Sequence, residues 1–217
     1  MNREQLQLYF IMGSQNTGQR DPLVVLEEAL RGGITIFQLR EKGADSLTGQ
    51  DKIQFAKACQ ALCKKYHVPF IINDDVDLAI ALDADGVHVG QEDASANVIR
   101  GKIGPKKILG VSTHSLVEVT AAIEDGADYV GIGPIYATTS KSDAKPPAGT
   151  ALIVQTTTVY PDLPLVGIGG ITIDNCQTVI RSGADGISLI SAIAAHEEPF
   201  VATRQILHVL QQQTKIL

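Results

Sequence analysis

Short apolar runs alternate along the chain with longer segments that have the spacing of helices. The short runs are rich in Val, Ile and Leu, and they are nearly continuous rather than alternating. Apolar runs of this kind are typical of parallel strands that are buried on both faces. We therefore expect eight strands, at Leu8–Met12, Ile34–Leu39, Pro69–Asn73, Gly86–Val89, Lys107–Val111, Tyr129–Gly133, Leu165–Ile168 and Gly186–Ile190.

The segments between these runs carry the end signals of helices. Asp21-Pro22 offers an acidic N-cap followed by proline at the first helical position, and this helix runs to Arg31, before two glycines. Further helices are expected at Gln50–Tyr66, Ser115–Asp125, Asp174–Arg181 and Pro199–Gln213.

A short motif recurs where a helix is followed by a strand. It reads DADGV at 83–87, GADYV at 126–130 and GADGI at 183–187, with a weaker fourth copy, GGI, at 32–34. A repeated joint indicates repeated α-to-β units, and eight units in 217 residues give about 27 residues each, the lower end of the range for a (β/α)₈ barrel. We predict an α/β fold, a (β/α)₈ TIM barrel, as one domain over residues 1–217. The alternative, an open doubly wound sheet, usually has fewer strands, and GSQNTG at 13–18 is not its GxGxxG turn.

Composition limits the partners of the chain. The formal net charge is 18 − 24 = −6, whereas nucleic acid and anionic membranes attract a positive field, so we expect neither as a partner and any anion site must be local. Cys59, Cys63 and Cys176 form no CxxC pair, so we expect packed free thiols. The first residues lack the pattern of a signal peptide, and no apolar run is long enough to span a membrane. We therefore expect a cytoplasmic protein.

Polar and glycine-rich residues follow the expected strands. In a (β/α)₈ barrel the carboxyl ends of the strands meet at one rim, where the active site forms. Any one of these segments is compatible with an ordinary cap or turn, whereas their joint placement predicts a site. The segments are Gln38–Lys42, Asn73–Asp75, Gly90–Asp93, Ser112–His114, Thr138–Lys141, Gly167–Gly170 and Ile190–Ser191.

Two carboxylates, Asp74 and Asp93, come from neighbouring strand ends and would repel each other without a cation. Mg²⁺ resolves this repulsion and leaves positions for phosphate oxygens and water. Because two adjacent acids exceed what one cap requires, we assign the following helix cap to Asp75 and the metal to Asp74.

Three cations, Arg40, Lys42 and Lys141, reach the same rim, and with a metal they suit a diphosphate. The glycine turn at 167–170 and Ile190-Ser191 suggest a second site, for a monophosphate held by backbone N–H groups.

The sequence contains no evident pattern of a covalent nucleophile. His88 lies within an apolar strand, so we interpret it as a packed core residue, and we expect His67, His196 and His208 to face solvent. His114 lies near the rim, and both a functional and a solvent-facing interpretation stay open.

At this point the chain resembles the thiamine phosphate synthase family from Tyr9 to Ile193. The motifs are QLREK at 38–42, NDD at 73–75, GVHVGQED at 86–93, GVSTH at 110–114, GADYVGIGPIYATTSK at 126–141, VGIGGI at 166–171 and GADGISLISAI at 183–193. The resemblance implies a (β/α)₈ barrel that joins hydroxymethylpyrimidine diphosphate to a thiazole phosphate, with release of diphosphate. Whether the thiazole carries a carboxylate stays open.

The resemblance also implies roles for individual residues. The pyrimidine diphosphate would be bound by Gln38, Leu39, Arg40, Glu41, Lys42, Asn73, Ser112 and Lys141. The thiazole phosphate would be bound by Thr138, Thr139, Ser140, Gly170, Ile190 and Ser191. Asp74 and Asp93 would bind Mg²⁺, and the catalytic residues would be Arg40, Lys42, Ser112 and Lys141. The implied path is dissociative: diphosphate leaves, and the thiazole nitrogen attacks a carbocation-like methylene.

Two other functions on the same fold, one catalytic and one not, stay open as alternatives. A thiazole tautomerase would carry a histidine after the sixth strand, where this chain has Gly133-Pro134-Ile135. A non-catalytic barrel that binds thiamine phosphate would not need Asp74 and Asp93. The segment GSQNTGQR at 13–20 is a candidate for a mobile flap, the contacts of the loop at 138–149 stay open, and a homo-oligomer is compatible with the sequence.

Overall fold

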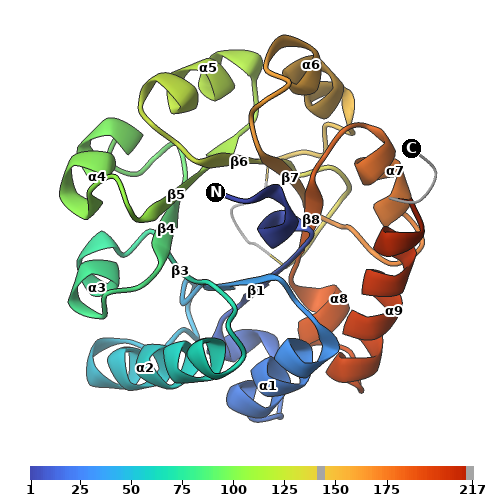
Figure 1. Cartoon of the computed structure of the whole chain (residues 1–217). Coiled ribbons are helices and arrows are strands. Elements are labelled where there is room, and N and C mark those ends of the chain that lie inside the picture. Colours follow the sequence, from blue (N-terminus) through green and yellow to red (C-terminus); the bar gives the residue numbers. More distant parts are fainter. Residues whose placement is uncertain (141–144, 214–217) are drawn as a thin grey trace.

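Eight parallel strands form a closed barrel in the computed structural model, which describes residues 1–140 and 145–213. Each strand pairs with its neighbours in sequence, and β1 pairs with β8 to close the ring (Figure 1). The eight predicted strands are confirmed, with ends that shift by at most two residues. They are β1 Leu8–Met12, β2 Ile36–Leu39, β3 Phe70–Asn73, β4 Gly86–Val89, β5 Ile108–Thr113, β6 Tyr129–Ile132, β7 Leu165–Ile168 and β8 Gly186–Leu189.

Helices surround the barrel, and together with the strands they make the predicted (β/α)₈ fold (Figure 1). They are α1 Pro22–Gly32, α2 Gly49–Lys65, α3 Val76–Ala81, α4 Ala96–Ile103, α5 Leu116–Glu124, α6 Ala151–Val159, α7 Cys176–Arg181, α8 Ser191–Ala194 and α9 Pro199–Gln213, with 3₁₀ turns η1 Arg3–Leu6 and η2 Ser14–Asn16. The pattern did not reveal α4, α6 or α8. In the part of the chain that the structure describes, no helix is long and apolar enough to cross a membrane.

The predicted caps explain where several helices begin and end. The carboxylate of Asp21 accepts from Leu23 N–H at 2.8 Å, and Gly33 ends α1 with a φ of 103°, a conformation that glycine adopts readily. The carboxylate of Asp75 accepts from Leu78 N–H at 3.0 Å, so Asp75 caps α3 as predicted.

The core has two parts, because side chains of a strand alternate between its two faces. The larger part lies between the strands and the helices and includes the free thiols of Cys59, Cys63 and Cys176. Burial raises the pKa of all three thiols, as expected for packed residues without reactivity. The smaller part fills the barrel and includes Leu6. The turn η1, which follows the N-terminus, lies over the middle of the ring in Figure 1.

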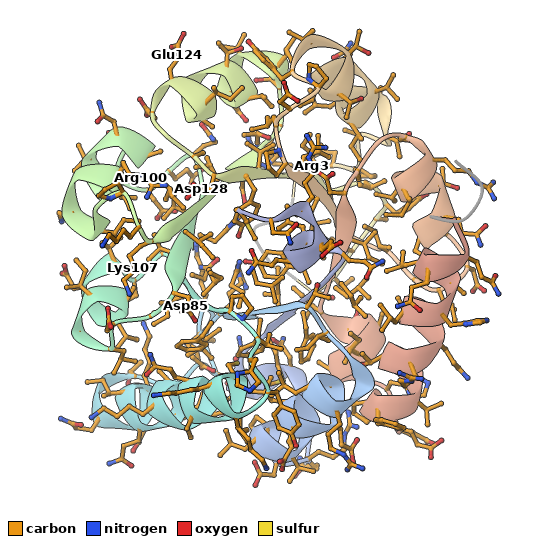
Figure 2. All side chains as sticks on the ribbon, in the orientation of Figure 1. Arg3, Asp85, Arg100, Lys107, Glu124 and Asp128 are labelled. Carbon is orange, nitrogen blue, oxygen red and sulfur yellow. The ribbon has the colours of Figure 1, made fainter. Side chains whose placement is uncertain are left out.

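At each recurring joint, two hydrogen bonds link the amino ends of neighbouring strands, and we call this pair of hydrogen bonds a clamp. Its aspartates, two of which are labelled in Figure 2, each accept through Oδ2 from a backbone N–H at the start of the preceding strand and return their own N–H to the same residue. The first distance is 2.8 Å for Asp85 with Phe70, Asp128 with Leu109 and Asp185 with Leu165. The return distances are 3.0, 2.8 and 3.0 Å in the same order.

At the weaker fourth copy, the next residue, Thr35, makes the same pair of hydrogen bonds with a hydroxyl in place of the carboxylate. Thr35 Oγ1 accepts from Leu8 N–H at 2.9 Å, and Thr35 N–H donates to Leu8 O at 2.9 Å. The four copies therefore join β1 to β2, β3 to β4, β5 to β6 and β7 to β8. The recurring motif marks a structural joint at the end of the barrel opposite the predicted site.

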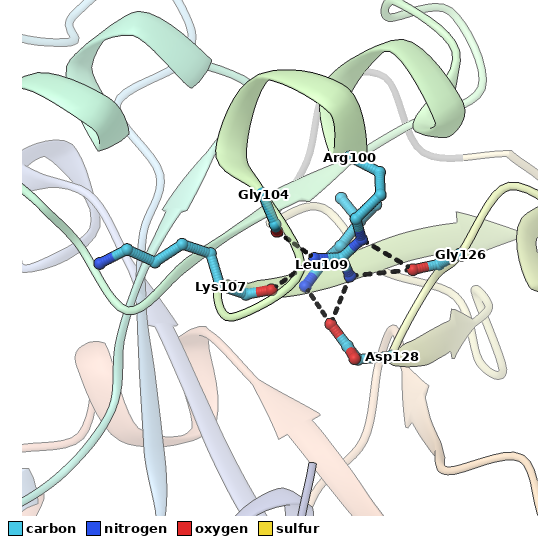
Figure 3. Close-up of polar contacts among 6 residues, drawn as sticks. All are labelled: Arg100, Gly104, Lys107, Leu109, Gly126 and Asp128. Atoms are coloured by element: carbon cyan, nitrogen blue, oxygen red, sulfur yellow. Dashed lines mark hydrogen bonds and ion pairs between the residues drawn. The ribbon is translucent and has the colours of Figure 1, made fainter.

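Arg100 of α4 strengthens one of these clamps (Figure 3). Its guanidinium donates to Asp128 Oδ2 at 2.6 Å and to the carbonyl oxygens of Gly104, Lys107 and Gly126 at 2.6 to 3.1 Å. One planar group therefore holds the end of α4, the segment that leads into β5 and the segment that leads into β6.

We expect Arg100→Lys to lower the melting temperature by about 4–8 °C, which corresponds to about 2 kcal/mol of unfolding free energy for a chain of this length. A lysine has one ammonium group and cannot reach three carbonyl groups and a carboxylate at once. Thermal unfolding checks this, with Arg204→Lys at an exposed position of α9 as the matched control. Equal melting temperatures for the two variants would contradict the expectation.

Candidate active site

A pocket opens at the carboxyl ends of the strands, opposite η1. Most of the predicted site residues line it, although they come from seven different loops or strand ends. They are Arg40, Lys42, Asn73, Asp74, Asp93, Ser112, Thr138, Ser140, Gly170, Ile190 and Ser191. The pocket therefore gathers residues that are up to 151 positions apart in the chain, from Arg40 to Ser191.

Other predicted residues lie outside this lining. Gln38 is 1% exposed inside the barrel, where its Nε2 donates to Tyr9 Oη at 2.7 Å, and Leu39 packs in the outer core. Thr139 is exposed. Lys141 lies outside the described residues.

Glu41 also points away from the pocket and ties two loops together. Its carboxylate accepts from Ser14 N–H at 2.5 Å, from Ser14 Oγ at 3.0 Å and from Leu47 N–H at 2.8 Å. Arg20, at the end of the suggested flap, donates to Ala194 O at 2.5 Å and to His196 O. The segment at 13–20 is thus hydrogen-bonded to the loop that follows β2 and to the end of α8 with the residues after it.

Asp74 and Asp93 meet at one side of the pocket. Burial of the carboxyl group, the negative charge of Asp74 and a hydrogen bond between the two carboxyl groups raise the pKa of Asp93, and a hydrogen bond from Gly90 N–H opposes the shift. That hydrogen bond joins Gly90 N to Asp93 Oδ2 at 2.7 Å. Lys42 Nζ lies 2.9 Å from Asp74 Oδ2 and balances part of the negative charge.

The backbone explains how two adjacent acids take separate roles. Asp74 has a φ of 60°, the left-handed conformation that aspartate tolerates better than most residues, and its N–H donates to His88 O at 2.9 Å. This turn directs Asp74 into the pocket, while Asp75 caps α3 and pairs with Lys52 Nζ at 2.6 Å.

Hydroxyl groups and a glycine turn form the opposite side. Ser140 Oγ donates to Ser191 Oγ at 3.1 Å, and Ser140 N–H donates to Thr138 Oγ1 at 3.2 Å. Gly169 and Gly170 have φ values of 99° and 62°. Because β2 to β4 and β6 to β8 lie across the ring from each other, the carboxylates and the hydroxyls face each other over the pocket.

The histidines are placed largely as expected. His88 is 8% exposed, and its two ring nitrogens each lie 2.9 Å from a hydroxyl oxygen, Tyr129 Oη and Ser112 Oγ. It is packed in the core as predicted, but the apolar run gave no signal of these polar contacts. His114 lines the pocket beside Glu118, with 3.2 Å between Nδ1 and Oε2, whereas His67, His196 and His208 are exposed.

Several lining residues had no assigned role at the sequence level. Gln91 and Glu92 belong to the predicted strand-end segment 90–93, and Gln91 Nε2 donates to Ser112 O at 2.7 Å. Ser188 lies inside β8, and Lys145 follows the undescribed residues 141–144. Membership of a strand-end segment was the available signal for the first two.

Comparisons with known proteins agree with this geometry. The sequence profile of the family described as thiamine monophosphate synthase matches residues 8–193. A thiamine-phosphate synthase of Lysinibacillus sphaericus (strain C3-41) is 58% identical over 198 residues, which cover 91% of this chain and 92% of that protein. A thiamine-phosphate synthase of Bacillus cereus (strain B4264) is 56% identical over 93% of this chain and 91% of that protein.

A solved structure has the same fold over nearly its whole length. It is a thiamine phosphate pyrophosphorylase from Pyrococcus furiosus, which is 33% identical and superposes with a TM-score of 0.85. The match covers 97% of this chain and 98% of that chain.

Proposed function

The chain belongs to the thiamine monophosphate synthase family, and on this premise we propose that it condenses 4-amino-5-hydroxymethyl-2-methylpyrimidine diphosphate with a thiazole phosphate. It is an enzyme of the transferase class, with small-molecule substrates. The products of the proposed reaction are thiamine phosphate and diphosphate.

One observation carries the proposal: a single pocket has a charged side and a hydroxyl-rich side. Asp74, Asp93, Lys42 and Arg40 lie on the first, and Thr138, Ser140, Gly170 and Ser191 on the second. A reaction that joins a diphosphate ester to a monophosphate ester requires two separate anion sites at one mouth. This arrangement supports the proposal, because it offers one candidate site for each anion.

The charged side suits the pyrimidine diphosphate. Arg40 lines the pocket and is 8% exposed, and a guanidinium can bind phosphate oxygens through paired hydrogen bonds. Lys42 is exposed and offers a point charge, and Asn73, which also lines the pocket, adds an amide group. Lys141 keeps its proposed role with the diphosphate on the strength of the sequence motif.

Asp74 and Asp93 would hold Mg²⁺, and the donor set fits this ion. Both are hard carboxylate groups, and their mutual repulsion makes a divalent cation favourable between them. The described residues contain no cluster of three or more His, Cys, Asp or Glu, so oxygens of the diphosphate and water would complete the ligands. When bound, the ion would neutralise charge on the leaving diphosphate.

The hydroxyl-rich side suits the thiazole phosphate. Thr138, Ser140 and Ser191 offer hydroxyl donors, and Gly170 leaves backbone N–H groups accessible without a side chain. The loop that carries Thr138 and Ser140 is bound to the end of β7, since Ile135 N–H donates to Ile168 O and Tyr136 N–H to Gly169 O, both at 2.9 Å.

The proposed chemistry exchanges one bond for another at the pyrimidine methylene carbon. Its bond to the diphosphate oxygen breaks, with the electron pair leaving on diphosphate, and a bond to the thiazole nitrogen forms. Arg40, Lys42 and Lys141 would stabilise the charge that develops on the leaving group, and Ser112 would orient the pyrimidine. Positioning and electrostatics then account for the rate, without a covalent nucleophile.

The direct test mixes the purified chain with the pyrimidine diphosphate, the thiazole phosphate and Mg²⁺, and measures thiamine phosphate and diphosphate. Stoichiometric appearance of both products is expected, together with loss of activity in excess chelator. A parallel reaction with the carboxylated thiazole phosphate decides which thiazole is used. If neither thiamine phosphate nor diphosphate formed in both reactions, the proposal would be refuted.

We expect Lys42→Gln to raise the KM for the pyrimidine diphosphate about tenfold or more, which corresponds to the loss of one charge-assisted contact. The KM for the thiazole phosphate should change little, because Lys42 lies on the charged side. Lys52→Gln is the matched control, since Lys52 pairs with the adjacent Asp75 at 2.6 Å and does not line the pocket. Equal changes in both KM values would argue against two separate anion sites.

A further inference from the structure

A chain of hydrogen bonds runs through the interior of the barrel to the pocket. Gln38 Nε2 lies 2.7 Å from Tyr9 Oη, and Tyr9 Oη lies 2.7 Å from Tyr129 Oη. Tyr129 Oη lies 2.9 Å from His88 Nδ1, and His88 Nε2 lies 2.9 Å from Ser112 Oγ. The first four side chains are at most 8% exposed, and only the last, Ser112, lines the pocket.

Gly110 of β5 allows the middle of this chain to form. It stands between His88 of β4 and Tyr129 of β6, with which it pairs in the sheet. A Cβ at Gly110 would lie 2.2 Å from Tyr129 Cζ and 2.4 Å from His88 Nδ1. The missing side chain leaves the space in which the imidazole and the phenol meet, so the contact is built into the sheet.

The number of hydrogen atoms on each group determines which group donates and which accepts along this chain of hydrogen bonds. The amide nitrogen of Gln38 only donates, so Tyr9 Oη accepts from it and has its own hydrogen left for Tyr129. Tyr129 then donates to His88 Nδ1, and the proton of a neutral imidazole must lie on Nε2. Nε2–H donates to Ser112 Oγ, and the hydroxyl hydrogen of Ser112 takes no part in the chain.

The opposite direction leaves a buried hydrogen without an acceptor. If His88 Nδ1 carried a proton, Tyr129 would have to donate to Tyr9, and Tyr9 would face the donor nitrogen of Gln38. An unpaired buried donor costs about 1–3 kcal/mol. Burial also raises the pKa of both tyrosines, so both hydroxyls keep their hydrogens.

We propose that this chain of hydrogen bonds holds His88 as the Nε2–H tautomer and thereby makes Ser112 a hydrogen-bond donor toward the ligand. Tyr9, Tyr129 and His88 are then positioning residues, which act through Ser112, and Gln38 sets the direction of the hydrogen bonds at their inner end. Ser112 would select a group that only accepts, such as a ring nitrogen or a phosphate oxygen of the pyrimidine diphosphate. This identification of the ligand rests on the proposed function, whereas the tautomer does not.

The first test observes the tautomer directly in the ligand-free protein. Long-range ¹H–¹⁵N spectra of ¹⁵N-histidine-labelled protein separate the two neutral tautomers, and His88 is assigned by the signal lost in His88→Gln. Protonation at Nε2 and an unprotonated Nδ1 are expected. In Tyr129→Phe the Nδ1 resonance should move downfield, because this nitrogen loses its hydrogen bond. A proton on Nδ1 of the unsubstituted protein would overturn the proposal.

The second test asks whether Tyr129 acts through Ser112. Tyr129→Phe should lower kcat/KM for the pyrimidine diphosphate about tenfold, the effect of one mispositioned hydrogen bond. In the Ser112→Ala background the same change should have no further effect, because the group that it positions is already absent. Independent, additive losses would overturn the positioning role.

Tyr160→Phe is the matched control for the removed hydroxyl. Tyr160 Oη lies 2.8 Å from Thr120 Oγ1, outside the pocket, so its loss should change neither the His88 resonances nor kcat/KM. The spectra need no substrate. If the unsubstituted protein formed no thiamine phosphate, the proposed function would fail while the tautomer was still decided.

Discussion

Asp93→Asn is expected to lower turnover about a hundredfold or more, while the metal-free protein becomes more resistant to heat. Asparagine keeps the volume of the side chain and an oxygen for Gly90 N–H, which now lies 2.7 Å from Oδ2. It removes the negative charge that the proposed Mg²⁺ requires. Activity falls because diphosphate would leave without the charge neutralisation that two carboxylates and a cation provide.

The gain in stability follows from the shifted pKa of Asp93. Burial and the charge of Asp74 raise this pKa above its value in the unfolded chain, so the folded state favours the protonated carboxyl group. The ionised form of Asp93 therefore opposes folding, and this cost disappears as the pH falls through the raised pKa. The difference in melting temperature between Asp93→Asn and the unsubstituted protein should therefore shrink toward acidic pH.

Calorimetric melting curves and turnover with excess Mg²⁺ check both parts. Asp162→Asn, at an exposed position, is the matched control and should change neither quantity. Full activity of Asp93→Asn, or of the unsubstituted protein in excess chelator, would contradict the assignment of Asp74 and Asp93 to the ion.

Gly170→Ala is expected to weaken the binding of thiazole phosphate at least about tenfold, with little change for the pyrimidine diphosphate. Gly170 has a φ of 62°, and an added Cβ would lie 2.4 Å from Ala137 O and 2.8 Å from Tyr136 Cβ. The methyl group would therefore push the loop after β6, which carries Thr138 and Ser140. The atom nearest to the added Cβ is therefore a backbone oxygen of this loop.

Gly18→Ala is the control that separates the contact of the new Cβ with Ala137 O from the strain of an alanine in the left-handed conformation. Gly18 has a φ of 63°, and nothing lies within 4 Å of an added Cβ, so both variants share a conformational cost of about 1–2 kcal/mol. Titration calorimetry of each folded variant with thiazole phosphate, and separately with the pyrimidine diphosphate, distinguishes the two effects. An unchanged affinity of Gly170→Ala for thiazole phosphate would place the second anion site elsewhere.

The order of strands and helices could be predicted from the chain alone, because local patterns determine it. A strand such as Leu165–Ile168 is apolar on both faces, and it is bounded by residues that favour turns. The rim residues followed from topology, since parallel strands bring all their carboxyl ends together. In this way Asp74 and Asp93 could be expected to meet before any contact was known.

The recurring joint illustrates what a local motif leaves open. The repeated aspartate of DADGV and GADYV signals a helix that leads into a strand, but the sequence does not say what its carboxylate binds. In the fold it accepts from the start of the preceding strand, across the ladder. That partner is 15 to 20 residues away, beyond any local pattern.

Within the site, the sequence determined which residues reach the rim, and tertiary structure decided where each side chain points. Strand alternation turns Leu39 into the outer core and Gln38 into the barrel, and the loop after β2 turns Glu41 toward Ser14. The phenols of Tyr9 and Tyr129 come from positions 120 apart and meet because closure brings inward-facing side chains of different strands together. Local sequence sets the elements, whereas such contacts depend on how the ring closes and on the space left by residues without a side chain.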